Sequence, residues 1–279
     1  MNVADASTAS NSLSFQLRAV PLLEDTTLAT FRSHAFEPTV PALLPRGTFK
    51  SLPAVKKWFR PAHATIPATL NTKYLQDYGA TIVPLEITNG DQFAQMEQPL
   101  SFFLEAASSV LKARVYLAQA SLSDLPAKLR DDVPTPELVQ VGKGDIYGTS
   151  IWLGQAPTYT PLHRDPNPNL FVQLAGTKRV RLFQPDVGRA IFADVQRMIG
   201  GTASATMRGA EMMEGEERKI LEEVVWGKEG EATDELVRQM GWECKVHSGD
   251  GLFIPKGWWH SIKGVGEGMT GSVSVSIHA

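Results

Sequence analysis

The chain has 279 residues, with 27 basic and 30 acidic side chains, a net charge of −3 and one cysteine. A hydrophobic share of 43% argues against a mainly disordered chain, and the small net charge disfavours a nucleic-acid binder that works through a global basic field. The single Cys244 excludes an internal disulfide and a cysteine-rich zinc cluster, so any metal site must be built from His, Asp and Glu.

The first segment, residues 1–12, is small and polar and is predicted to be disordered. It lacks the basic start and apolar core of a secretory signal, and no later stretch has the length and hydrophobicity of a transmembrane helix. We therefore expect an intracellular protein, cytoplasmic or nuclear, without membrane contact. Residues 13–279 are expected to form a single domain.

Short apolar segments separated by prolines make up the part of the chain from about residue 13 to 145. Apolar periodicity predicts a short helix over Leu52–Phe59 and a longer one over Pro99–Leu111. A strand is predicted over Ala80–Ile87, where Pro84 suggests an edge or a bulge. The apolar stripe expected on the longer helix consists of Phe102, Phe103, Ala106 and Val110.

The segments at 112–186 and 242–277 have the texture of β-strands, because Gly, Pro and Asn divide them into short apolar runs. The block between them, about 187–240, is predicted to be helical, with helices over Ile191–Ile199 and Glu211–Trp226. We therefore predict a mainly β protein, a sandwich or barrel with flanking helices and a helical insertion. The predicted strands are Arg114–Gln119, Asp145–Leu153, Thr158–His163, Asn169–Leu174, Arg179–Phe183, Trp242–Val246, Gly251–Pro255 and Gly271–Ile277.

The insertion carries much of the acidity of the chain. Between Met207 and Glu235, ten acidic and four basic residues give a local net charge of −6, which leaves +3 for the rest. A charge run of this kind is usually a solvated helix face. The alternative interpretation is a substrate-recognition element that favours a basic peptide.

Residues 160–165 read Thr-Pro-Leu-His-Arg-Asp and contain two candidate metal ligands. Residues two apart in a strand face the same side, so His163 and Asp165 can converge on one point. His260 offers a third ligand, because it follows a Gly249-Asp250 turn and a short apolar strand. Two His and one carboxylate form the facial triad of non-haem Fe(II) oxygenases. The other histidines lack comparable partners and are expected in surface or core roles: His34, His63, His247 and His278.

Six motifs in the β-rich segments are similar to those of one known family. They are Arg114–Gln119, Trp152-Leu153-Gly154, Thr160–His163, Asn169–Lys178, Phe253-Ile254-Pro255 with Trp259-His260, and Ser272–Ser276. Together they resemble the JmjC-type, cupin-like Fe(II)/2-oxoglutarate-dependent oxygenases, particularly the small hydroxylase branch. The similarity runs from about Pro41 to Ile277. It implies a double-stranded β-helix, the jelly-roll or cupin barrel, with a helical N-terminal region.

The resemblance also implies roles for individual residues. His163, Asp165 and His260 would bind Fe(II). Lys178 would hold the distal carboxylate of the cosubstrate 2-oxoglutarate as a buried point charge. The alternative for Lys178 is a surface lysine on a β-turn.

Four further residues are assigned near the cosubstrate by the same resemblance. Tyr116 and Thr160 would donate their hydroxyls to the distal carboxylate, although Tyr116 could instead be a core tyrosine. Asn169 and Ser276 occupy positions where relatives carry polar residues, and both could be structural. The tryptophans of the motifs are expected to be packing residues: Trp152, Trp258 and Trp259.

The implied function is hydroxylation of a protein side chain with Fe(II), 2-oxoglutarate and O₂, which yields succinate and CO₂. N-methyl-lysine demethylation and tRNA-base hydroxylation would use the same metal centre. The small size of the chain and its lack of Cys-rich reader modules favour hydroxylation, whereas a basic patch beside the pocket would favour a tRNA substrate. A catalytically silent cupin that serves as a binding module is the alternative from another class. The expected partner is a protein or peptide, basic if the insertion recognises it, and the sequence indicates no oligomeric state.

Overall fold

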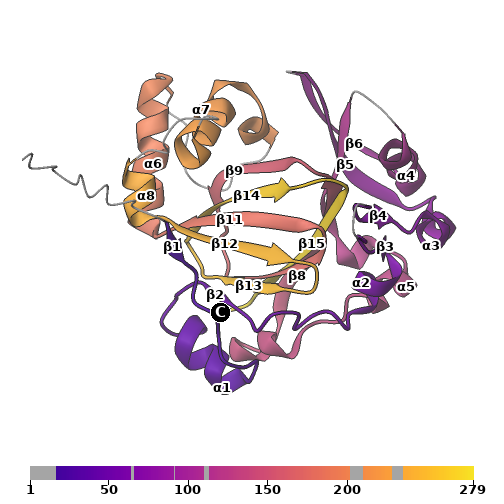
Figure 1. Ribbon diagram of the computed structural model, residues 1–279, viewed down its shortest axis with the longest axis horizontal. Helices are drawn as coiled ribbons and strands as arrows, with labels where there is room; N and C mark the ends of the chain where they lie inside the picture. Colours follow the sequence, from indigo (N-terminus) through magenta and orange to yellow (C-terminus); the bar gives the residue numbers. More distant parts are fainter. Residues whose placement is uncertain (1–16, 64–65, 91, 110–112, 202–209, 228–234) are drawn as a thin grey trace, which may run out of the picture.

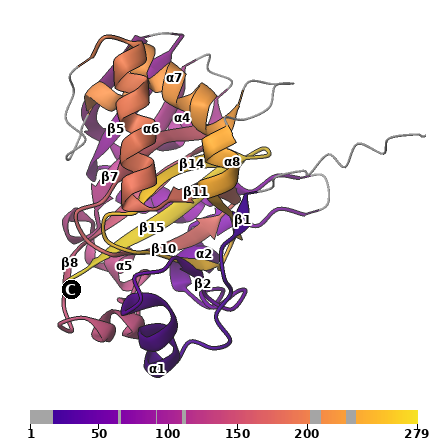
Figure 2. The same ribbon diagram turned by 90° about the vertical axis from the view of Figure 1, so that its left-hand side faces the viewer.

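A computed structural model describes residues 17–63, 66–90, 92–109, 113–201, 210–227 and 235–279 (Figure 1). Two largely antiparallel β-sheets form the middle of this part of the chain, and helices lie around them (Figures 1 and 2). The predicted disorder of residues 1–12 lies outside the described residues.

Strands β8 to β15 form a jelly-roll barrel. They divide into two four-stranded antiparallel sheets with the orders β12-β11-β14-β9 and β13-β10-β15-β8. Successive strands change sheet except at β11 and β12, and this connectivity confirms the predicted double-stranded β-helix. The bounds are Ile146–Gln155 (β8), Thr158–Arg164 (β9), Asn169–Ala175 (β10), Thr177–Phe183 (β11), Trp242–His247 (β12), Gly251–Ile254 (β13), Trp259–Val265 (β14) and Met269–Ile277 (β15).

The sequence predicts every one of these strands except β14. Both faces of β14 are covered, because Trp259 packs against the insertion while His260 and Ile262 face the other sheet. A strand that is enclosed on both faces lacks the alternation of apolar and polar residues on which the prediction rests.

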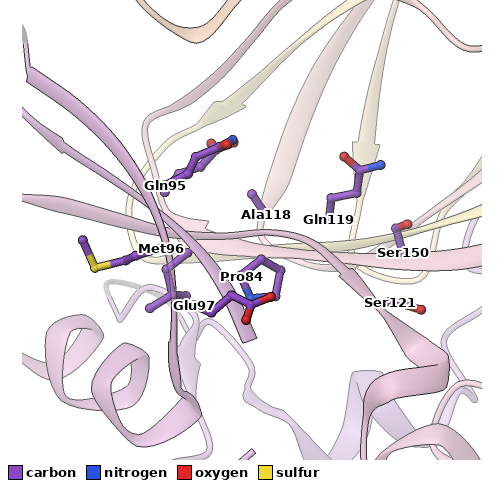
Figure 3. A pocket seen from close by; sticks show the side chains of 10 residues that line it. Pro84, Gln95, Met96, Glu97, Ala118, Gln119, Ser121 and Ser150 are labelled. Atoms are coloured by element: carbon purple, nitrogen blue, oxygen red, sulfur yellow. The ribbon is translucent and has the colours of Figure 1, made fainter. Parts of the chain in front are cut away.

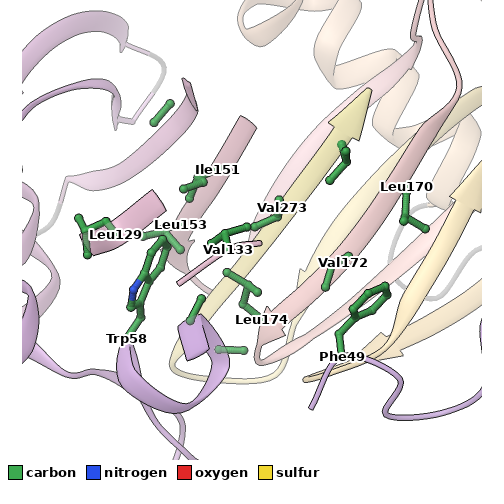
Figure 4. Packing of buried hydrophobic residues seen from close by; sticks show 14 of the residues in the cluster. Phe49, Trp58, Leu129, Val133, Ile151, Leu153, Leu170, Val172, Leu174 and Val273 are labelled. Atoms are coloured by element: carbon green, nitrogen blue, oxygen red, sulfur yellow. The ribbon is translucent and has the colours of Figure 1, made fainter. Parts of the chain in front are cut away.

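Alternation along β10 explains how one strand serves the core and the cavity. Leu170, Val172 and Leu174 point outward and belong to the core cluster that also contains Phe49 and Trp58 of the N-terminal region (Figure 4). Phe171 points the other way, into the space between the sheets. Burial of each such aliphatic side chain contributes roughly 2 kcal/mol, so this outer cluster anchors the N-terminal region on the sheet.

Strands β7, β5 and β6 extend the second sheet beyond β8. The predicted strand over Ala80–Ile87 is present, but its suggested edge position is wrong, because β6 pairs with it on one side and β7 on the other. Pro84 is tolerated since the pairing with β7 begins only at Leu85, so no β7 residue lies opposite the proline. The bounds are Ile82–Asn89 (β5), Gln92–Pro99 (β6) and Arg114–Ser121 (β7).

The helix α4 (Leu100–Ser108) corresponds to the longer helix predicted in the N-terminal region. It buries Leu100, Phe103 and Leu104, whereas Phe102 is 40% exposed, so the predicted stripe is wrong at Phe102. The helix begins at Leu100, and positions i, i+3 and i+4 from that residue form its buried face. Val110 lies outside the described residues. The other predicted helix is the shorter α2 (Pro53–Lys57).

The helical insertion is present and connects β11 to β12, which are paired neighbours. Because the two strand ends lie side by side, a long excursion between them leaves the sheet intact. Its helices cover the outer face of the first sheet, where Ile191, Leu221 and Val225 pack with Phe183 and Trp259. The bounds are Pro185–Met198 (α6), Ala210–Met213 (a 3₁₀ turn, η5), Gly215–Trp226 (α7) and Glu235–Met240 (α8).

Short elements complete the described chain. Among its residues, no helix is both long enough and apolar enough to cross a membrane. The remaining bounds are Arg18–Ala19 (β1), Leu28–Phe31 (α1), Arg32–Phe36 (η1), Ala42–Leu43 (β2), Phe59–Arg60 (β3), Thr69–Leu70 (β4), Thr72–Leu75 (α3), Gln76–Tyr78 (η2), Leu122–Asp124 (η3), Ala127–Asp131 (α5) and Glu137–Val141 (η4).

Candidate metal and cosubstrate site

A cavity of about 200 Å³ lies between the two barrel sheets. Its lining brings together all eight residues singled out in the sequence: Tyr116, Thr160, His163, Asp165, Asn169, Lys178, His260 and Ser276. They come from six strands and from the segment between β9 and β10. The barrel therefore gathers residues that lie up to 160 positions apart in the sequence.

One end of the cavity holds the two histidines and the aspartate. His163 on β9 and His260 on β14 are paired residues of adjacent strands, and their ring centroids lie 4.2 Å apart. Asp165 follows β9, with carboxylate oxygens 4.0 Å from Nε2 of His163 and 3.8 Å from Nε2 of His260. The three ligand atoms all lie within 4.8 Å of one another, a spacing that one metal ion can bridge.

Backbone carbonyls orient both imidazoles. Nδ1 of His163 lies 2.8 Å from the carbonyl oxygen of Pro161, and Nδ1 of His260 lies 3.3 Å from that of Trp258. A carbonyl only accepts, so each Nδ1 carries the proton and each Nε2 presents its lone pair toward Asp165. Metal-binding histidines have this arrangement.

Burial and neighbouring side chains shift the pKa values of His260 and Asp165 at this end of the cavity. Burial lowers the pKa of His260 to about 4, which keeps its imidazole neutral at physiological pH. For Asp165, burial opposes ionisation, but the two histidines and a hydrogen bond of 3.0 Å from Asn169 Nδ2 hold its pKa below the ordinary value. The ionised carboxylate of Asp165 and the neutral imidazole of His260 are in the state that binding of a divalent cation requires.

Lys178 lies at the other end of the cavity and is only 3% exposed. Its Nζ donates to Ser272 Oγ at 2.8 Å, lies 3.5 Å from the Tyr116 hydroxyl and stands over the Phe171 ring at 5.5 Å from the centroid. Burial lowers its pKa to about 7. No carboxylate among the described residues pairs with it, so the amine is a buried cation prepared for an anionic ligand. The alternative of a surface lysine is excluded.

A β-bulge explains why Thr160 and His163 both line the cavity. Three residues apart in a regular strand, they would face opposite sides. The pairing with β14 shifts between them, since His163 lies opposite His260 and Thr160 lies opposite Ile262. The extra residue in β9 turns both side chains inward.

A second bulge, between Leu117 and Ala120 of β7, turns Gln119 toward the cavity. Gln119 has a φ of 55°, in the left-handed region that non-glycine residues seldom adopt. Nothing in a single sequence signals this conformation. Gln119 is therefore a cavity residue that was not predicted from the sequence.

The serines of β15 were a missed signal of another kind. Ser272, Ser274 and Ser276 alternate with valines, so one face of the strand is polar and lines the cavity while the valines enter the outer core. Only Ser276 was predicted, although the alternation itself marks all three. Trp258 and Trp259 are buried as expected, whereas Trp152 lines the cavity.

A groove of about 660 Å³ adjoins the cavity and shares Gln119 and Ser150 with it (Figure 3). Its walls include the carboxylates of Glu86 on β5 and Glu97 on β6. Glu86 is 9% exposed, burial raises its pKa, and its hydrogen bond comes from the neutral amide of Gln95 at 3.2 Å. Among the described residues, the lining of the groove is acidic and includes no basic side chain.

These donors fit the cofactors expected from the sequence. Two imidazoles and one carboxylate suit Fe(II), and they leave coordination positions open. The buried and unpaired ammonium of Lys178 suits a carboxylate such as the distal one of 2-oxoglutarate. The two ends of the cavity thus match a metal and a dicarboxylate.

Comparison with known proteins agrees with this geometry. The family model for a cupin-like domain matches residues 28–278. Lysine-specific demethylase JMJ30 of Arabidopsis thaliana is 28% identical over 205 residues, which cover 71% of this chain and 43% of the relative. The bifunctional peptidase and (3S)-lysyl hydroxylase JMJD7 of Homo sapiens is 27% identical over 249 residues, 81% of this chain and 74% of that protein.

Lysine-specific demethylase 8 of Xenopus tropicalis is 25% identical over 252 residues, which cover 88% of this chain and 50% of the relative. The chain thus spans about half the length of the two demethylases and about three quarters of the human protein.

Proposed function

The chain belongs to the cupin-like, JmjC-type family, and from that membership we propose that it is an Fe(II)- and 2-oxoglutarate-dependent oxygenase that hydroxylates a protein side chain. The family uses Fe(II), 2-oxoglutarate and O₂, and the triad in the cavity is compatible with iron. The observation that carries the proposal is the presence, in one cavity, of this triad and of a buried lysine without a carboxylate partner among the described residues.

In this proposal the residues of the cavity divide the binding by charge. His163, Asp165 and His260 hold the metal, and Lys178 with its neighbouring hydroxyls holds the distal carboxylate of the cosubstrate. Bound Fe(II) and 2-oxoglutarate supply the oxidation of a substrate C–H bond by O₂, with succinate and CO₂ as coproducts. The chain itself orients the two imidazoles through backbone carbonyls and places the Lys178 amine where the distal carboxylate would lie.

The acidic groove supports a basic side chain as the substrate. A lysine or arginine that enters along it would meet Glu86, a mostly buried carboxylate whose nearest described positive charge is Arg218 of the insertion. Glu97 lies on the same face of the sheet, because it is opposite Pro84 while Glu86 is opposite Gln95. The names of the relatives JMJD7 and JMJ30 refer to lysine, which agrees with this charge.

The acidic residues of the insertion lie away from the cavity and the groove wherever the structure describes them. Its Glu222 pairs with Lys263 of the barrel at 2.7 Å, and its Glu217 is buried against Gln196. No described acidic residue of the insertion lines the cavity or the acidic groove. We therefore assign preference for a basic substrate to the groove, and to the insertion a structural role on the barrel.

Two alternatives use the same metal centre. Demethylation of a methylated lysine is favoured by the names of two relatives, and it would require the groove to admit a methylammonium group. A tRNA base is disfavoured by the carboxylates of the groove that adjoins the cavity, although a second pocket, which shares Tyr116 with the cavity, carries Arg114 and Arg218 beside Glu86. A silent binding module is disfavoured by the intact triad and by Lys178.

The metal and cosubstrate are tested by anaerobic titration with Fe(II) and then 2-oxoglutarate, followed by visible absorption. The wild-type protein is expected to develop a charge-transfer band, and His163→Ala is expected to lack it. His247→Ala serves as the matched control, because His247 lies outside the cavity. Absence of the band in the wild-type protein contradicts the proposal.

The reaction is tested by mass spectrometry of a library of lysine- and arginine-containing peptides, unmodified and N-methylated. Hydroxylation predicts the gain of one oxygen atom in products of the wild-type protein and none with His163→Ala. Loss of a methyl group with release of formaldehyde from the methylated peptides alone would establish demethylation instead.

A further inference from the structure

Tyr116 reaches the cosubstrate end of the cavity from a strand outside the barrel. Tyr116 lies on β7, which pairs with one edge of β8. Its neighbour Ser272 lies on β15, which pairs with the other edge of β8, and its neighbour Lys178 lies on β11 of the opposite sheet. Adjacent strands are about 4.8 Å apart, so the Tyr116 ring has to cross the width of β8 to bring its hydroxyl beside Lys178.

Gly154 is the residue of β8 that Tyr116 crosses. The two are paired in register, so they occupy the same face of the sheet. A Cβ added to Gly154 would overlap Cδ2 of the Tyr116 ring and would lie 2.6 Å from Cε2. Gly154 is not among the glycines with a positive φ, so the position requires space for the ring and makes no demand on the backbone.

Other contacts hold the ring in this crossing position. Trp152, two residues before Gly154 on the same face, contacts the ring with a centroid distance of 6.3 Å and an interplanar angle of 38°. The hydroxyl then lies 3.5 Å from Nζ of Lys178. Burial raises the pKa of the Tyr116 hydroxyl, so it stays protonated and can donate to a bound anion.

We propose that Gly154 is a positioning residue for the cosubstrate: the absence of a side chain on Gly154 lets Tyr116 lie across β8 and place its hydroxyl beside Lys178. Any side chain at position 154 displaces the Tyr116 ring and removes its hydroxyl from the lysine. The inference rests on the proposed function, because it takes 2-oxoglutarate as the anion that Lys178 and Tyr116 bind together.

The test is the dissociation constant of 2-oxoglutarate, measured by calorimetry with Mn(II) in place of Fe(II) so that no turnover occurs. Gly154→Ala is expected to weaken binding by about 10-fold or more, which is the loss of one hydrogen bond to a charged group. Gly148→Ala is the matched control on the same strand, because a Cβ there would meet no atom within 4 Å. It is expected to bind like the wild type.

A double-mutant cycle distinguishes positioning from general damage to the site. If Gly154 acts through the ring, Gly154→Ala causes no further loss of affinity in a Tyr116→Ala background, since the colliding atoms are gone. Equal losses in both backgrounds, or a Gly154→Ala protein that binds like Gly148→Ala, overturn the inference. Unchanged Mn(II) affinity in each variant checks that the barrel is folded.

The two levels of the proposal fail in different ways. A wild-type protein that does not bind 2-oxoglutarate contradicts the proposed function and the inference with it. A wild-type protein that binds 2-oxoglutarate, with Gly154→Ala unaffected, contradicts the inference alone.

Discussion

At one end of the cavity a carboxylate lies beside two imidazoles, whereas at the other end a single lysine amine lies among hydroxyls and an aromatic ring. The metal end is partly open, with about 26% of the His163 side chain and 30% of the Asp165 side chain exposed. The lysine end is closed, with Lys178 at 3%. The cavity is therefore polarised, negative at its open end and positive at its closed end.

This difference shows how the fold prepares two kinds of ligand. At the metal end, backbone carbonyls and Asn169 fix the ligands before any ion arrives. At the lysine end, the barrel holds an uncompensated charge away from water, which opposes folding until an anion neutralises it. We expect substitutions at the metal end to act on affinity for the ion, and those at the lysine end to act on both cosubstrate affinity and stability.

The largest effect is expected from His260→Ala. The variant removes a proposed metal ligand. Affinity for the metal should therefore fall by more than the roughly 10- to 100-fold loss that is typical when a residue hydrogen-bonded to a ligand is mutated. Turnover should disappear with it. Equilibrium titration with Mn(II), with His247→Ala as control, measures the loss. Wild-type metal affinity in His260→Ala would show that the triad is not the metal site.

Lys178→Met tests the other end. Affinity for 2-oxoglutarate should fall by roughly 10- to 100-fold, because a charge-assisted hydrogen bond is lost, while affinity for Mn(II) stays unchanged. The free energy of unfolding of the ligand-free variant should rise by at least about 1 kcal/mol, since an unpaired buried charge is removed. Calorimetry and urea denaturation measure the two quantities. Parallel loss of both affinities would contradict the division of the cavity into two ends.

The stability of the wild-type protein and its affinity for 2-oxoglutarate should both depend on pH through Lys178. The folded pKa of Lys178 is about 7, below its ordinary value of 10.5. Between these values the unfolded chain holds a proton that the folded chain has released, so the free energy of unfolding from this group rises with pH across that window. Affinity for 2-oxoglutarate should instead decline as pH rises through about 7, with proton uptake on binding. Lys178→Met should abolish both slopes.

A smaller loss is expected for Asn169→Ala. Its amide holds the Asp165 carboxylate at 3.0 Å, so its removal should weaken metal binding by about 10-fold and leave the 2-oxoglutarate dissociation constant nearly unchanged once the metal is saturating. Mn(II) titration checks the first quantity and calorimetry the second. Weaker binding of 2-oxoglutarate with unchanged Mn(II) affinity would mean that Asn169 contacts the cosubstrate and does not support the metal ligand Asp165.

The smallest change is predicted for Ser272→Ala, which removes the shortest hydrogen bond of Lys178. The expected result is a few-fold weaker binding of 2-oxoglutarate, equivalent to about 1 kcal/mol. Ser274→Ala is the control, because it lies on the same face of β15 and no hydrogen bond joins it to Lys178 in the described structure. Equal effects from the two variants would mean that Ser272 has no special relation to the lysine.

Much of the site could be predicted from the sequence because its signals are local. His163 and Asp165 lie two residues apart at the end of a strand, and His260 follows a turn and an apolar strand. The resemblance to a family then added the lysine and its neighbours, and the structure gathers all eight residues in one cavity. The roles of these residues as metal and cosubstrate ligands stay predictions, as does the single domain over residues 13–279.

The N-terminal region was harder to predict because its pairings are remote. Strand β6 was missed, and it takes from β5 the edge position that Pro84 had suggested. On α4, the point where the helix begins decides which residues are buried, and the apolar pattern alone placed Phe102 in the core instead of Leu104. Both errors concern neighbours that the local pattern does not specify.

Local apolar patterns in the sequence thus predicted a sandwich or barrel with a helical insertion, and the resemblance to a known family implied the double-stranded β-helix. The triad was predicted from the spacing of His163 and Asp165 and from the turn and apolar strand before His260. Only the tertiary structure decided that the bulge in β9 lets Thr160 face inward beside His163, that Ser272 contacts Lys178 and that Tyr116 lies across Gly154. The reason is physical: strand register and close approach depend on what the opposite strand presents, and a single sequence does not specify that partner.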